Sequence, residues 1–188
     1  MKIEEAIVKI DNFFNPELLK LILLYSKKKC TKYLGIGRGE IGEIKEDVRR
    51  VKGYSLNENL PGDIIYYKHI QKEVTRAYVF YKAKFPRLDL KTQKLNQIDL
   101  LKYEIDGHYR THIDHAWTTE RTLSCIINLN DNYKGGNLIF YDPLTMKEIK
   151  RYELKKGTIV FFPSCFLYPH KIEPITEGVR YSIVAWLI

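Results

Sequence analysis

The chain has 188 residues, of which 45% are apolar and 13% aromatic, enough to bury one core of ordinary domain size. Lys and Arg outnumber Asp and Glu by 31 to 23, and this net charge of +8 is spread along the chain. Such a charge fits either a solvated basic surface or one that attracts acidic partners. Three cysteines without a CxxC pair argue against a disulfide framework and against a thiolate zinc site.

The amino-terminal sequence carries acidic residues early and has no apolar stretch of signal-peptide length. No apolar run elsewhere approaches the length of a membrane span. We therefore expect a soluble, intracellular protein of the cytoplasm without a membrane partner, folded as one domain over residues 1–188.

The first half of the chain predicts helices. After a short strand in AIVKIDNFF, residues 16–28 have apolar side chains at helical spacing, with Pro16 in the first turn and Asn15 as the N-cap. Apolar positions recur at helical intervals again over residues 62–85, which predicts a long amphipathic helix that ends before Pro86.

A glycine-rich segment from Tyr33 to Asp47 separates the two helices. Four glycines lie among its charged residues, but the GK[ST] ending of a phosphate-binding loop is missing. This composition favours a flexible loop.

The second half of the chain predicts strands. Its apolar segments are short, rich in β-branched and aromatic residues, and separated by turn residues: LNQIDLLKYEI, TLSCIINLN, GNLIFYD, TIVFFPS and RYSIVAWLI. Helices followed by at least five strands indicate an α+β fold, a β-sandwich or jelly roll backed by N-terminal helices, and argue against a parallel α/β sheet.

The candidate chemistry starts from His112 and Asp114 in GHYRTHIDHA. Side chains two apart in an extended segment point to the same side, so this imidazole and carboxylate could hold one ion, although an isolated His-x-Asp is more often a surface pair. His170 follows an apolar strand and turn, where a facing strand could present it as a third ligand. Two histidines and one carboxylate on one face of an ion are typical of non-haem Fe(II) oxygenases.

Arg180 strengthens this interpretation. It follows His170 by ten residues and begins the last apolar strand. Its planar guanidinium suits a bidentate contact with the carboxylate of a co-substrate. The alternative interpretation is an ordinary arginine at the solvated end of a strand. His108 would need a different acidic partner, and His115 adjoins Asp114 and points to the opposite side. We expect both to be exposed or to lie behind the ligands. His69 is expected on an ordinary helix face.

These residues resemble the 2-oxoglutarate and Fe(II)-dependent dioxygenases, and among them the prolyl 4-hydroxylase-like branch. The resemblance covers roughly residues 95–188, and the first half fits more loosely through FFNPELLKLI and RRVKGYSL. It is carried by an ordered set of segments: KYEIDGHYRTHIDH, GGNLIFYD, KKGTIVFFPS and PHKIEPITEGVRYSIVAW.

The resemblance implies a double-stranded β-helix, or jelly roll, over residues 95–188, with helical support and an active-site loop in residues 1–94. It implies that His112, Asp114 and His170 bind Fe(II) and that Arg180 binds the far carboxylate of 2-oxoglutarate, supported by the hydroxyl of Tyr103. O2 would be the second co-substrate, and ascorbate is a candidate reductant.

Three further residues bear on the co-substrate pocket. Ser182 shares a strand face with Arg180 and could add a hydrogen bond, and Trp186 lies farther along the same face, where the family often has a tryptophan lining the pocket. For both, ordinary strand packing is an equal interpretation. Asn128 stands where some relatives have a tyrosine, so the surroundings of the co-substrate are expected to differ.

The resemblance also suggests a substrate, a prolyl residue in a peptide or protein, which the Tyr33–Asp47 loop with Arg49 and Arg50 could cover. The alternatives are another peptide side chain, a small molecule, or a non-catalytic jelly-roll module that retains a metal. A nucleic-acid substrate is less expected, because the carboxyl-terminal RYSIVAWLI offers a single arginine.

Overall fold

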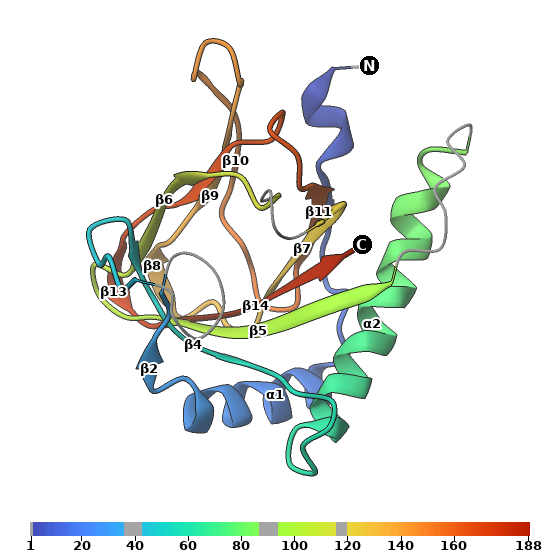
Figure 1. The fold of residues 1–188 in the computed structure, drawn as a ribbon, viewed down its shortest axis with the longest axis vertical. Helices are drawn as coiled ribbons and strands as arrows, with labels where there is room; N and C mark the ends of the chain where they lie inside the picture. Colours follow the sequence, from blue (N-terminus) through green and yellow to red (C-terminus); the bar gives the residue numbers. More distant parts are fainter. Residues whose placement is uncertain (1, 36–42, 87–93, 116–119) are drawn as a thin grey trace.

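The computed structural model describes residues 2–35, 43–86, 94–115 and 120–188 (Figure 1). The middle of the predicted glycine-rich loop, residues 36–42, lies outside the described residues. The helical elements are η1 (Ile3–Ala6), a 3-10 helix, and the α-helices α1 (Pro16–Lys29) and α2 (Ile64–Ala83). The strands in chain order are β1 (Val8–Ile10), β2 (Lys32–Tyr33), β3 (Arg49–Arg50), β4 (Lys52–Ser55), β5 (Leu95–Tyr103), β6 (His108–His112), β7 (Leu123–Asn128), β8 (Tyr133–Gly135), β9 (Leu138–Tyr141), β10 (Glu148–Tyr152), β11 (Ile159–Pro163), β12 (His170–Ile172), β13 (Ile175–Gly178) and β14 (Arg180–Leu187).

Antiparallel pairing organises these strands into two main sheets. The larger has the order β1-β11-β7-β14-β5-β4-β2, and the smaller has the order β10-β9-β12-β6-β3. A separate pair joins β13 to β8. Neighbours in these sheets are mostly distant in sequence, as in a jelly roll, so the predicted fold class is confirmed.

The larger sheet has two buried faces, and β14 shows how the sequence separates them. Ile183 and Ala185 belong to a core that includes residues of both α-helices, whereas Val184 and Trp186 belong to a second core shared with the smaller sheet. Because successive side chains of a strand point to opposite faces, one apolar strand serves both cores. In Figure 1, α1 and α2 accordingly lie outside the strands, on the side of β4 and β5.

Local signals explain where α1 begins and ends. The side chain of Asn15 accepts hydrogen bonds from the backbone N–H groups of Glu17 and Leu18 at 2.9 and 3.2 Å, as predicted for an N-cap. Three lysines occupy the last turn, where positive charge is favourable beside the free carbonyl groups. The predicted boundaries of both helices therefore agree with the structure to within about two residues.

The segment RRVKGYSL, which the resemblance includes only loosely, contains two short strands. β3 pairs with β6 in the smaller sheet, and β4 pairs with β5 in the larger sheet, with the buried Val51 between them. This short segment therefore crosses from one layer of the sandwich to the other.

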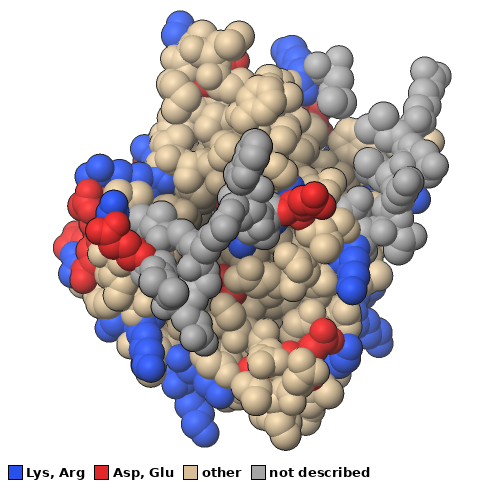
Figure 2. Space-filling model, in the orientation of Figure 1, with Lys and Arg blue, Asp and Glu red and all other residues tan. Residues whose placement is uncertain are grey.

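Charged side chains are intermixed on the face of the molecule in Figure 2, where Lys and Arg lie around the edge with Asp and Glu among them. Among the described residues, no helix is both long and apolar enough to cross a membrane.

A buried carboxylate joins the helical layer to the larger sheet. Asp63, fully buried just before α2, accepts hydrogen bonds from the hydroxyl groups of Tyr25 and Tyr54 and from the backbone N–H of Asn57, and Lys29 lies 3.7 Å away. Burial would raise the pKa of Asp63, but these hydrogen bonds and the nearby ammonium outweigh it and hold the pKa below its usual 3.8.

We expect Asp63→Asn to lower the free energy of unfolding by about 2 kcal/mol at pH 7, because the amide replaces a carboxylate that accepts three hydrogen bonds. The depressed pKa stabilises the fold above pH 3.8, and this contribution is lost as the pH falls through the folded-state value. The difference between wild type and variant, measured by urea unfolding, should therefore shrink below about pH 4. Tyr54→Phe, which keeps the carboxylate, is the control; an equal difference for Asp63→Asn at all pH values would contradict this account.

Candidate active site

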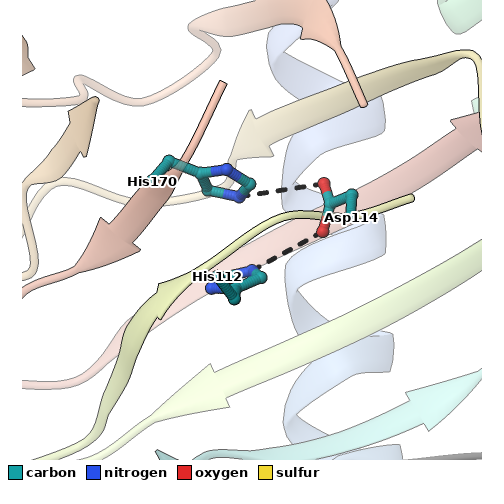
Figure 3. A group of neighbouring side chains, drawn as sticks. All are labelled: His112, Asp114 and His170. Atoms are coloured by element: carbon teal, nitrogen blue, oxygen red, sulfur yellow. Dashed lines mark ion pairs between the residues drawn. The ribbon is translucent and has the colours of Figure 1, made fainter. Parts of the chain in front are cut away.

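The pairing of β6 with β12 brings the three predicted ligands together. His112 lies directly opposite His170 in this antiparallel pair, and Asp114 follows two residues after the end of β6. One potential ligand atom from each residue lies within 4.8 Å of the other two. Figure 3 shows both imidazole rings facing the Asp114 carboxylate, with 3.5 Å from His112 Nε2 and 3.8 Å from His170 Nε2 to its oxygens.

Backbone carbonyls orient both imidazoles. Nδ1 of His112 lies 2.8 Å from the Arg110 carbonyl, and Nδ1 of His170 lies 3.0 Å from the Tyr168 carbonyl. In a neutral ring, Nδ1 then carries the proton, and the lone pair of Nε2 faces the carboxylate. Burial, together with the nearby His112, lowers the pKa of His170 to about 4, so His170 is neutral at pH 7.

Asp114 is buried and ionised. Burial would raise its pKa, but the two imidazoles and a hydrogen bond from the Ser124 hydroxyl outweigh this effect and hold the pKa well below its usual range. A deprotonated carboxylate and two imidazole Nε2 lone pairs are donors that suit a divalent first-row metal ion. The described side chains therefore fit a metal with a His-Asp-His ligand set.

A cavity extends from this group between the two sheets and includes about 410 Å³ of space, part of it open to solvent. The larger sheet supplies one wall and the smaller sheet the other, so the cavity lies inside the jelly roll. Its lining residues are Arg49, Leu101, Tyr103, Tyr109, His112, Asp114, Ile126, His170, Ile172, Arg180, Ser182, Ile183, Val184 and Trp186.

Arg180 is buried in this cavity with an exposed fraction of only 1%. Its Nε donates to the side-chain oxygen of Asn128 at 3.1 Å, and its guanidinium carbon lies 5.1 Å from the centre of the Tyr103 ring. Its Nη2 is buried without a hydrogen-bond partner, and no carboxylate among the described residues pairs with Arg180. A buried guanidinium without a counter-charge is costly, so the cavity is suited to an anion.

The side chain of Asn128 is held in place beside Arg180 by its own hydrogen bonds. Its amide nitrogen donates to the carbonyls of Asn130 and Leu154 at 2.6 and 2.8 Å, which fixes its side-chain oxygen toward the guanidinium. The hydroxyl of Tyr133 lies 3.2 Å from that same oxygen. The sequence identified Asn128 as a difference from some relatives, but it did not identify Tyr133.

The remaining predicted residues separate into two groups. Ser182 and Trp186 line the cavity together with Tyr103. His69 is exposed on α2, and His115 is exposed, with its Nδ1 3.2 Å from the Arg121 carbonyl. The ring nitrogens of His108 contact the carbonyls of Asp106 and Asp47.

Arg49 and Arg50, which the sequence analysis grouped together, point to different places. Arg49 lines the cavity, its guanidinium carbon lies 4.8 Å from the centre of the Tyr109 ring, and its Nε is buried without a partner among the described residues. Tyr109 in turn stacks on His112 with ring centres 3.5 Å apart. Arg50 instead lies near Glu46 and Asp106, outside this cavity.

Arg121 also contributes to the site, and the sequence analysis did not identify it. It donates to the backbone carbonyl of Asp114 at 3.3 Å and to the side chain of Gln97 at 3.2 Å, and its guanidinium carbon lies 3.6 Å from the centre of the Trp186 ring. A single arginine in a loop gives no periodic signal. Ser124 does give one, because Ser124, Ile126 and Asn128 occupy alternate positions of β7, so that two polar residues share one face of a fully buried strand.

Comparison with known proteins identifies one matching family model, the 2OG-Fe(II) oxygenase superfamily, over residues 98–188. Among curated proteins, a PKHD-type hydroxylase of Rippkaea orientalis is 29% identical over 103 residues, which cover 50% of this chain and 44% of that protein. The chain thus spans about half the length of the curated relatives that it matches.

Two solved structures share the fold along almost the whole chain. A prolyl hydroxylase from Trichoplax adhaerens, in complex with a peptide fragment of the hypoxia-inducible factor oxygen degradation domain, is similar with a TM-score of 0.75 and 19% identity, covering 97% of this chain and 83% of that one. A prolyl-4-hydroxylase of Pseudomonas putida is similar with a TM-score of 0.69 and 17% identity, covering 96% and 91%.

Gly136 packs closely against the side chains of Ile175 and Arg180. Gly136 has φ +65°, and an added Cβ would lie 2.4 Å from Ile175 Cδ1 and 3.1 Å from Arg180 Cδ. Gly136→Ala should lower the unfolding free energy by about 2–4 kcal/mol, from backbone strain plus overpacking. The matched control is Gly157→Ala, with φ +77° and a nearest contact of 3.2 Å to Leu19, which should lose only about 1–2 kcal/mol. Equal losses in urea unfolding would show that contact with Ile175 and Arg180 is unimportant.

Proposed function

We propose that this chain is a dioxygenase that uses Fe(II), 2-oxoglutarate and O2 to hydroxylate a prolyl residue in a peptide or protein. Residues 98–188 match the model of the 2OG-Fe(II) oxygenase superfamily. In this proposal His112, Asp114 and His170 bind Fe(II), and Arg180 binds the far carboxylate of 2-oxoglutarate. The observation that carries the proposal is a buried arginine without a counter-charge in the same cavity as a His-Asp-His group.

The metal and its co-substrates supply the oxidising chemistry, in which 2-oxoglutarate is converted to succinate and CO2 while a C–H bond is hydroxylated. The chain supplies three protein ligands on one side, which leaves positions open for a co-substrate. The backbone carbonyls behind both imidazoles keep their Nε2 atoms directed at the metal position.

The chain also selects and orients the co-substrate. Asn128 holds the Arg180 guanidinium through Nε, which leaves Nη2 available for a carboxylate oxygen. In this proposal the hydroxyl of Tyr103, a residue that is 2% exposed and lines the same cavity, supports that carboxylate. Apolar side chains such as Leu101, Ile126 and Val184 form the walls and limit the access of water, which strengthens the charge–charge contact.

Support for a prolyl substrate comes from the relatives and from the position of Arg49. Two of the similar folds are prolyl hydroxylases, and one of them was solved with a peptide. Arg49 lines the cavity and has a buried Nε–H without a partner among the described residues, and in this proposal a peptide carbonyl or an acidic side chain accepts its hydrogen bond. In this proposal ascorbate is the reductant that keeps the metal as Fe(II), and the hydroxylation itself does not consume it.

The proposal is tested with a panel of proline-containing peptides, Fe(II), 2-oxoglutarate and ascorbate. We expect succinate to form and a peptide to gain the mass of one oxygen atom on proline. His170→Ala should abolish both, and Arg180→Ala should raise the KM for 2-oxoglutarate by about 100-fold, because it removes a buried charge-assisted contact. If the wild type neither binds 2-oxoglutarate nor forms succinate, the enzyme assignment is wrong. If the oxygen atom is found on another residue, only the prolyl substrate has to be replaced.

Arg49 and Arg50 provide a matched pair for the peptide site. Arg49→Ala should raise the KM for the peptide by about tenfold, the effect of losing one hydrogen bond to a charged donor. Arg50→Ala, on the neighbouring residue outside the cavity, should leave this KM within about twofold of wild type. Binding of 2-oxoglutarate, followed by calorimetry, should be unchanged in both variants. An equal loss in the two variants would mean that general positive charge, and not the cavity contact, attracts the peptide.

A further inference from the structure

Two buried serines lie behind the candidate metal ligand Asp114. Ser124, on β7, is 0% exposed, and its hydroxyl donates to Oδ2 of Asp114 at 2.6 Å. Ser164, directly after β11, is 1% exposed, and its hydroxyl oxygen lies 2.8 Å from that of Ser124. The three side chains thus form a row that runs from one strand end to the metal site.

The direction of the hydrogen bonds in this row follows from the single hydroxyl proton of Ser124. Ser124 donates that proton to Oδ2 of Asp114, so its oxygen can only accept from Ser164. The Ser124 oxygen then accepts the proton of Ser164, and donation from behind strengthens the charge-assisted bond in front.

The backbone ties the same residues together. The N–H of His115, adjacent to Asp114, donates to the carbonyl of Ser164 at 2.9 Å, and the N–H of Ser164 donates to the carbonyl of Thr122 at 3.0 Å. Asp114 lies beyond the end of β6, so no strand pairing fixes it directly. Its side chain is instead held by Ser124 of β7, its carbonyl accepts from Arg121, and the backbone of its neighbour His115 is held by Ser164.

We propose that Ser124 and Ser164 are positioning residues that fix the orientation of the Asp114 carboxylate and so set the affinity of the site for a divalent metal, with Ser164 acting through Ser124. This inference rests on the proposed function, because it requires that Asp114 binds a metal. Hydrogen-bond partners behind metal ligands typically change metal affinity by about 10–100-fold.

The proposal is tested by titrating the metal-free protein with Mn²⁺ and following the free ion by electron paramagnetic resonance. Ser124→Ala should weaken Mn²⁺ binding by about tenfold, and Ser124→Thr, which keeps the hydroxyl, should restore most of the affinity. Ser164→Ala should weaken binding in the wild-type background and have no further effect in Ser124→Ala, because its only proposed route to the metal passes through Ser124.

Ser26→Ala is the matched control. Ser26 is also 0% exposed, but its hydroxyl donates to the Ile22 carbonyl within α1, in the helical layer. It should not change Mn²⁺ affinity. Thermal unfolding of the metal-free proteins separates a loss of fold from a loss of metal affinity, and Ser164→Ala in the wild-type background retains the test if Ser124→Ala does not fold.

The possible outcomes distinguish the two proposals. If the wild type binds Mn²⁺ and His170→Ala does not, but Ser124→Ala binds as tightly as wild type, the positioning role is wrong and the metal site remains. A full additional loss from Ser164→Ala in the Ser124→Ala background would also overturn the coupled row. If the wild type does not bind Mn²⁺, both proposals fail.

Discussion

The position of β14 in the middle of the larger sheet is the constraint on which the rest of the site depends. All eight of its residues are buried, and it is hydrogen-bonded to β5 on one side and to β7 on the other. This double pairing places Arg180 beside Tyr103 and Ser182 beside Asn128. A slip by one residue would turn the arginine toward the helices and an apolar side chain into the cavity, so the register of the core and the charge of the site are fixed together.

Some of this arrangement follows from the sequence because it depends on local periodicity. The two helices, the N-cap at Asn15 and the strand character of the second half were all predictable from spacing and composition. The convergence of His112, Asp114 and His170 was inferred from residue types and a family resemblance, and the structure brings these three side chains together. Their role as iron ligands remains a prediction, as does that of Arg180.

Other parts depend on contacts between distant segments, which periodicity does not reveal. The halves of RRVKGYSL pair in different sheets, which no local pattern indicates, and the alternation of side chains within β3 separates Arg49 from Arg50. Ser124 reaches Asp114 only because β7 lies close to the end of β6 in the fold. Arg121 belongs to the same class, because its partners Gln97, Asp114 and Trp186 come from three separate segments.

The crossing of Val51 from one sheet to the other has a mechanical consequence. A few residues connect Arg49, at the edge of the cavity, to Tyr54, whose hydroxyl contacts Asp63 beneath the helices. Residues 49–55 therefore connect the two sheets at one side of the sandwich, and Tyr54 joins this segment to the helical layer. At its other end, β3 pairs with β6, the strand that carries the candidate ligand His112. Loosening of the helical layer would thus be passed along one short segment to two parts of the cavity wall, Arg49 directly and His112 through the pairing of β3 with β6.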